Sequence, residues 1–152
     1  MNMKRFISVC ICLALFFVLL LPVQAAEESR STVISQKEYI LDNGLTVIEE
    51  ITETTYARSS TKYGEKRAEV KYGDTTIAIV IISGQFGYDK TKAWVISKNQ
   101  VQVDTNDGWS YQELSYTSSG ATISLTYKLT KLLVVNNTYS MSLTCDKDGN
   151  FS

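Results

Sequence analysis

The amino-acid sequence predicts an all-β fold, an antiparallel β-sandwich of Ig-like architecture, with a small β-barrel as the alternative. Three observations predict this class. No proline follows Pro22, and Thr, Val, Ile, Ser and Tyr dominate the chain, a composition that favours pleated strands. Short stretches alternate apolar and polar residues between turn residues at close intervals. The chain offers no convincing amphipathic helix after its leader, so we expect eight to nine short strands.

The first 25 residues are typical of a secretory signal peptide, and we expect this helix to precede the domain. Lys4 and Arg5 form a short positive region. An uncharged apolar run follows from 6 to 21, and Pro22 and small residues end it. Cys10 and Cys12 lie inside this leader, in positions that do not suit lipid attachment.

The leader divides the chain into three expected parts. Cleavage is expected after Ala25, or alternatively after Ala26. Residues 26–36 are expected to be a flexible mature N-terminus, and residues 37–152 a single β-sandwich domain. The pattern predicts a secreted, extracellular protein that meets the membrane only through its leader before cleavage. The alternative is a protein tethered to the membrane by an uncleaved leader.

Charge and missing residue types exclude several function classes. The leader holds two of the 15 basic residues and none of the 16 acidic ones, so the mature side chains are mildly acidic. Such a domain lacks the clustered charge that nucleic acid requires, and the one basic cluster, KYGEKR at 62–67, is interpreted as a solvated turn. The chain has no histidine and one cysteine after the leader. Histidine-dependent catalysis, zinc sites and internal disulfides are therefore excluded, and we expect no cofactor and no enzyme activity.

The first expected hairpin is YILDNGLTVIEE, residues 39–50. Asn43 and Gly44 predict a two-residue type I′ turn. This turn would place Ile40 opposite Val47 and Tyr39 opposite Ile48.

The stretch from 75 to 88 predicts a strand that is apolar on both faces. We interpret it as a central strand whose outer face the N-terminal segment covers. The alternative is a surface for a partner or for self-association. One face would carry Ile77, Ile79 and Ile81, and the other Ala78, Val80 and Ile82. Short strands at 93–97 and 101–103 follow, and a turn then leads into a strand that begins near Trp109.

The last two strands form a second predicted hairpin. Alternation over 121–135 directs Ile123, Leu125, Tyr127 and Leu129 inward, and Tyr139, Met141, Leu143 and Cys145 share one face of the next strand. To keep both sets on one side, we expect a three-residue loop, 136–138, with Val135 opposite Tyr139. A bulge near Lys131 is the alternative.

Acidic loops and the remaining cysteine give no catalytic or metal site. The loops that start at Asp104 and Asp146 lack the ligand spacing of a calcium-binding EF-hand, so we interpret them as turns. Cys145 has no histidine to activate it, and it lies on the same face of the strand as the inward residues. It is predicted to be a buried free thiol, with an intermolecular disulfide as the alternative.

Aromatic residues beside acidic turns offer one candidate ligand platform for stacking a sugar. The alternative is that these aromatic rings fill the sandwich core. The candidates are Trp94, Trp109 and Tyr111, with Tyr116 nearby, beside Asp104, Asn106 and Asp107.

Four stretches carry a resemblance to a known group: GQFGYDKTKAWVIS, GWSYQEL, ISLTYKLTKLLVV and the ending SLTCDKDGNFS. Over 68–152 the chain resembles small secreted single-domain β-sandwich proteins of Gram-positive bacteria, whose function is uncharacterised. The resemblance implies a sandwich fold and an extracellular setting, and it implies no activity.

These observations predict a secreted, non-enzymatic module that binds an unknown protein, an envelope or glycan partner, or another copy of itself. The first alternative is a small carbohydrate-binding protein, or a carbohydrate-active one that uses two carboxylates. The second is a secreted effector or toxin, which exposure of the face at 77–82 would favour.

Overall fold

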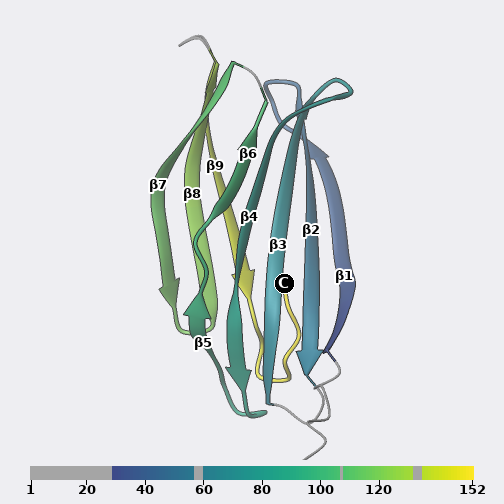
Figure 1. Cartoon of the computed structure of the whole chain (residues 1–152), viewed down its shortest axis with the longest axis vertical. Helices are drawn as coiled ribbons and strands as arrows, with labels where there is room; N and C mark the ends of the chain where they lie inside the picture. The colour runs from purple at the N-terminus through teal and green to yellow at the C-terminus, as the bar shows by residue number, and fades with distance from the viewer. Residues whose placement is uncertain (1–28, 57–59, 107, 132–134) are drawn as a thin grey trace, which may run out of the picture.

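The structure is a computed structural model that describes residues 29–56, 60–106, 108–131 and 135–152. Nine strands form two antiparallel sheets, and this part of the chain contains no helix (Figure 1). The strands are β1 (Ser29–Ile40), β2 (Leu45–Tyr56), β3 (Thr61–Tyr72), β4 (Thr75–Tyr88), β5 (Ala93–Lys98), β6 (Gln102–Thr105), β7 (Trp109–Ser119), β8 (Thr122–Lys131) and β9 (Val135–Thr144).

The two sheets differ in width. The larger sheet has the order β1-β2-β3-β4-β5. The strand β6 also pairs with β4, at residues 78–81, whereas β5 pairs at residues 84–88. The smaller sheet has the order β7-β8-β9. The two sheets do not close into a barrel, so the predicted all-β sandwich is confirmed and the barrel alternative is wrong. The Ig-like expectation holds at the level of two packed antiparallel sheets. The strands β1 to β5 and β7 to β9 follow one another as meanders, and β6 pairs with β4, whereas immunoglobulin domains use Greek-key connections.

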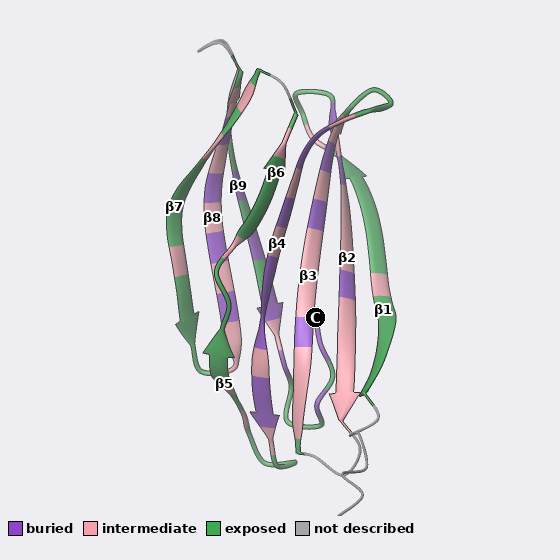
Figure 2. Cartoon of the chain, in the orientation of Figure 1, coloured by how far each residue is buried: buried purple, intermediate pink, exposed green. Residues whose placement is uncertain are grey.

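The core lies between the sheets, where β9 contacts β3, β8 contacts β4 and β5, and β7 contacts β5 and β6. Figure 2 shows buried residues alternating along β8 and filling much of β4, whereas β1 and β7 are mostly exposed. The inward set predicted for β8 and β9 is buried. Its buried members are Ile123, Leu125, Tyr127, Leu129, Tyr139, Met141, Leu143 and Cys145.

The first strand begins earlier than the sequence predicts. Residues 29–36, expected to be part of a flexible N-terminus, pair with β2 instead. The predicted leader and its cleavage site lie outside the described residues. The part of the chain that the structure describes contains no helix long and apolar enough to cross a membrane.

The predicted register of the first hairpin is wrong by one residue. Tyr39 lies opposite Val47, and Ile40 lies opposite Thr46. The loop has three residues, not two, because the Leu41 N–H donates to the Leu45 carbonyl and Gly44 alone in it takes a positive φ of 80°. This register places Tyr39 on the inner face and leaves Ile40 74% exposed.

The register of the last hairpin also differs from the prediction. Tyr127 lies opposite Tyr139 and Lys131 opposite Val135, so residues 136–138 belong to β9, and residues 132–134 lie outside the described residues. Both registers keep the same faces inward, because they differ by an even number of residues. The structure's register pairs ten residues of β8 with β9, a far longer ladder than a loop at 136–138 would leave.

The central position predicted for β4 is confirmed. The N-terminal segment, which was expected to cover its outer face, does not lie over it. β1 pairs with the far side of β2 and lies in the same sheet. A bulge turns Ile77 toward the core, where Ala78, Val80 and Ile82 are also buried. Ile79 and Ile81 remain half-buried on the outer face, flanked by polar residues of β3 and β6.

The segment 62–67 is a strand, which corrects its interpretation as a turn. It forms the first half of β3, and Lys62 and Lys66 point to the inner face with Ala68 and Val70. Both lysines are paired with inward glutamates of β2.

Candidate functional site

The predicted platform is not assembled. The two tryptophans lie at opposite ends of the β7–β8 hairpin. Trp109 begins β7 opposite Lys131. Trp94 lies near the hairpin turn, because the N–H of the next residue, Val95, donates to the Gly120 carbonyl. About 34 Å of strand separates these two ends. Trp94 lies over Gly87 of β4, and Trp109 borders a hollow of about 290 Å³ with Tyr72.

Of the other platform residues, Asn106 stays beside Trp109, whose N–H donates to the Asn106 carbonyl at 3.1 Å. Tyr111 packs against Tyr127, with ring centroids 5.6 Å apart, as the core alternative predicts. Asp104 is exposed on β6, and the Asn106 side chain donates to the Thr76 carbonyl. The Tyr116 hydroxyl donates to the Asn99 carbonyl at 2.7 Å. Asp107 lies outside the described residues.

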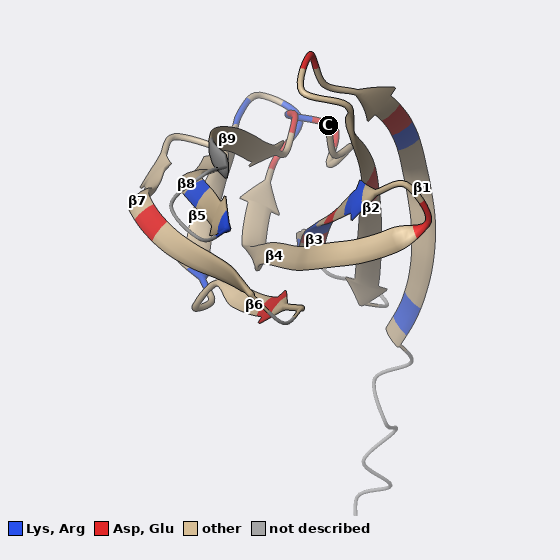
Figure 3. Ribbon diagram, turned by 90° about the horizontal axis from the view of Figure 1, so that it is seen from above, with Lys and Arg blue, Asp and Glu red and all other residues tan. Residues whose placement is uncertain are grey.

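The structure brings together a different set of residues on the open side of the sandwich. Because β9 lies over β3, β1 and β2 extend beyond the smaller sheet, as the view from above shows (Figure 3). A hollow of about 380 Å³ lies between the β1–β2 hairpin and β9, and we call it the β1–β9 groove. It is lined by Tyr39, Leu41, Asp42, Asn43, Asn137, Thr138, Tyr139 and Ser140.

Two buried polar groups at this groove lack partners. The Tyr139 Oη and the Asn137 Nδ2 are buried, with no hydrogen-bond partner among the described residues. Burial raises the pKa of Tyr139, and the nearby amides of Asn43 and Asn137 only partly oppose this effect, since neither reaches hydrogen-bond geometry. Leaving such groups unpaired is costly, so the site favours a ligand that hydrogen-bonds.

The ring of Tyr139 is held rigidly from the core side. It stacks on Tyr127 with centroids 5.3 Å apart and planes 19° apart, and Tyr127 in turn contacts Tyr111. Burial raises the pKa of Tyr111 to about 12, with Glu113 adding to the effect. The three rings form a continuous aromatic ladder that fixes the inner wall of the groove.

The opposite wall is held by a charged residue. The Tyr39 hydroxyl donates to Glu49 at 3.3 Å, and Glu49 is paired with Lys66 at 3.0 Å. Desolvation, followed by the charge of Glu49, raises the pKa of Tyr39 to about 12. Lys66 and Glu49 also line a smaller hollow of about 160 Å³, with Lys37 and Phe151, next along the inner face of β1.

Glu49 and Glu53 are the inward carboxylates of β2, and they do not form a catalytic pair. They are four residues apart on one strand, about 13 Å along its axis. Each is bound to a lysine: Glu49 to Lys66, and Glu53 to Lys62 at 3.1 Å. The geometry therefore gives the two-carboxylate hypothesis no support.

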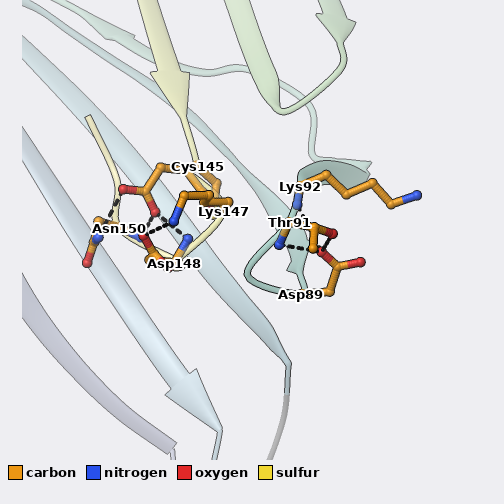
Figure 4. A network of polar contacts seen from close by, with 8 residues as sticks. Asp89, Thr91, Lys92, Cys145, Lys147, Asp148 and Asn150 are labelled. Atoms are coloured by element: carbon orange, nitrogen blue, oxygen red, sulfur yellow. Dashed lines mark hydrogen bonds and ion pairs between the residues drawn. The ribbon is translucent and has the colours of Figure 1, made fainter.

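The ending of the chain folds back as a tight hairpin on β9 (Figure 4). The Asp146 carboxylate accepts hydrogen bonds from the Asp148 N–H, the Asn150 N–H and the Asn150 amide, at 2.8–2.9 Å. These bonds lower the pKa of Asp146. The arrangement is the predicted turn, and no group of acidic residues in the described ranges could hold a metal ion.

Cys145 begins this turn as a buried free thiol. Burial raises its pKa to about 11, and the Asp146 charge contributes. A thiol in this state is a poor nucleophile at neutral pH, which agrees with its prediction as an inert residue.

Sequence reasoning identified Tyr139 as inward but missed the β1–β9 groove. The groove depends on two features that alternation cannot reveal: the one-residue register of the first hairpin and the difference in width between the sheets. Asn137 was interpreted as a loop residue, although it lies in β9.

Comparison with protein-family models, with curated proteins and with solved structures gives no match for this chain.

Proposed function

We propose that this chain is a secreted, non-enzymatic module that binds an extracellular or cell-envelope partner in the β1–β9 groove. The unpartnered Tyr139 hydroxyl carries the proposal. This side chain is only 8% exposed, is locked by ring stacking, and borders a hollow large enough for part of a polymer. A folded chain retains such an unpaired group most readily where a ligand completes it.

The extracellular setting rests on the leader. The positive start, the apolar run and the small residues before Ala26 support cleavage and export. Intact mass of the native chain tests this part of the proposal. A chain that starts at Ala26 or Glu27 in the culture supernatant is expected, and a full-length envelope species would mean a tethered module.

The binding test compares two conservative variants. Tyr139→Phe keeps the stacked ring and removes the groove hydroxyl, whereas Tyr111→Phe removes a buried hydroxyl away from the groove. Sedimentation with isolated envelope and with extracellular fractions should show at least a roughly tenfold loss of affinity for Tyr139→Phe only. Equal binding by both variants and the native chain would contradict the groove as the site.

Carbohydrate binding is the second candidate, because tyrosine rings and asparagine amides line the same groove. The effector hypothesis gains no support, since Ile77 and Ile82 are buried. Self-association through Ala78, Val80 and Ile82 would require the sandwich to open.

A further inference from the structure

We propose that the β1–β9 groove takes an extended peptide segment of another protein, which pairs with the free edge of β9 as an added strand. The inference rests on the proposed function and names the class of partner. It follows from the backbone of β9, from the width of the overhanging sheet and from the side chains that line the groove.

Hydrogen bonds at the end of β9 show which backbone groups point away from β8. The Cys145 N–H donates to the Ala121 carbonyl at 3.0 Å, toward β8. Thr144 points the other way, because its N–H and carbonyl both bond to Ser152, at 2.9 Å each. Ser152 therefore already occupies the first position of a fourth strand in the smaller sheet.

The free edge continues along β9 from this point. Direction alternates along a strand, and the β8–β9 ladder has no bulge, so Ser142, Ser140 and Thr138 share the orientation of Thr144. Among the described strands, β9 pairs only with β8. These three residues consequently offer N–H and carbonyl groups beside the groove that Thr138 and Ser140 line.

The overhang of β1 and β2 provides room for an added strand. β9 lies over β3, so the larger sheet extends two strands, or about 10 Å, past the edge of β9. A strand that follows Ser152 antiparallel to β9 would lie beside Lys37, Glu49 and Lys66, whereas the apolar inward residues of β2 are already buried. Peptide recognition by strand addition uses this combination of backbone pairing and flanking side-chain pockets.

The same overhang argues against a second copy as the occupant. A symmetric dimer through two β9 edges would place both larger sheets on the same side, with the β1–β2 overhang of each in the space of the other. The long edge of the larger sheet, β1, carries a bulge at Ile34 and three charges, Arg30, Lys37 and Glu38, which disfavour edge pairing. A single extended segment meets neither obstacle.

The side chains specify the chemistry of the segment. Near Tyr39 and Tyr139 the groove is aromatic, and the buried Asn137 Nδ2 beside it has no hydrogen-bond partner among the described residues. Further along, Lys37 and the Glu49–Lys66 pair make it polar. We expect an apolar or aromatic residue and a hydrogen-bond acceptor at the first end, and polar residues at the second.

Amide hydrogen exchange measured by NMR tests the inference. The probes are eight-residue peptides that alternate Thr with Val, Tyr or Gln at the groove-facing positions. Bound peptide should slow exchange of the Ser140 and Ser142 amides at least tenfold, and should leave the Ser118 amide on the free edge of β7 unchanged. Backbone N-methylation of the peptide should abolish the effect.

A matched pair of variants separates backbone pairing from other binding. Ser140→Pro removes an edge N–H and leaves the backbone ladder to β8 intact, although it also removes the Ser140 hydroxyl that bonds to Thr126 Oγ1 at 3.2 Å. Ser118→Pro removes an edge N–H on β7 in the same way. Peptide binding should fall at least tenfold in Ser140→Pro and remain in Ser118→Pro. If no peptide binds, or if binding is insensitive to both the proline and N-methylation, strand addition is wrong.

A parallel titration with soluble wall-glycan fragments distinguishes the two proposals. Glycan-induced shifts at Tyr39 and Tyr139 without peptide binding would overturn strand addition and retain the groove as a binding site. If neither peptides nor glycans perturb these residues, the proposed function fails as well.

Discussion

At the scale of single residues, Gly64 shows how closely the chain ending is fitted to the sandwich. A Cβ atom on Gly64 would lie 2.7 Å from two carbons of the Phe151 ring, which also meets Phe86 edge-on at 5.1 Å. Gly64→Ala should therefore reduce the free energy of unfolding by about 1–3 kcal/mol, measured by urea denaturation.

A double-mutant cycle identifies the cause of this loss. In a Phe151→Leu background the added methyl group meets a smaller side chain, so Gly64→Ala should cost less than it does alone. Purely additive costs would show that the strain arises elsewhere.

The alternation of apolar and polar residues predicts some features of single residues and not others. The inward positions of Tyr139 and Cys145 follow from period-two patterning, and the structure places both in the core. Trp94 and Trp109 looked close because both are near acidic turns in the sequence. Their separation depends on the direction of the β7–β8 hairpin, which no local pattern contains.

At the scale of elements, β4 carries two apolar faces of unequal importance. Ile82 is fully buried between the sheets, whereas Ile81 is half-buried on the outer face beside Arg67. Ile82→Thr should lower the free energy of unfolding by about 2–4 kcal/mol, because it creates a cavity and buries a hydroxyl. Ile81→Thr should cost less than about 1 kcal/mol. Similar losses in urea denaturation would mean that another surface covers the outer face.

Strand registers mark the limit of what patterning predicts for the elements. In the last hairpin, two registers that differ by an even number of residues bury the same side chains, so alternation fixed the faces but not the loop. In the first hairpin, Asn43-Gly44 indicated a two-residue turn. The structure uses a three-residue loop, in which the Asn43 side chain accepts the Leu45 N–H at 3.0 Å.

At the scale of the whole molecule, unequal sheets explain both the core and the groove. The apolar core extends onto β2 through Leu45, Val47 and Ile51. The inner face of the overhang also carries Lys37, Tyr39 and Glu49. Composition and turn spacing predict the sandwich, since they depend on all strands together. The sequence contains no comparable signal for which strands remain uncovered, so it could not predict the candidate site.

Buried tyrosine hydroxyls and the Cys145 thiol make the whole fold sensitive to alkaline pH. Burial raises the pKa of Tyr39 and Tyr111 to about 12 and that of Cys145 to about 11. In the unfolded chain these groups ionise near their ordinary values, about 10 for tyrosine and 8.5 for cysteine. Above about pH 9 the unfolded state therefore loses protons that the folded state keeps, so stability falls as the pH rises.

Tyr111→Phe tests this sensitivity and the structure of the ladder together. The Tyr111 Oη is buried, with no hydrogen-bond partner in the described part of the chain. Removing it should change stability at pH 7 by less than about 1 kcal/mol, or raise it. Between pH 9 and 11 the variant should lose less stability than the native chain, because it lacks the Tyr111 hydroxyl, whose pKa folding raises. Urea denaturation across this range, with tyrosinate absorbance recorded in parallel, measures both effects. A loss above about 2 kcal/mol at pH 7 would instead mean that the hydroxyl is satisfied in solution and stabilises the sandwich.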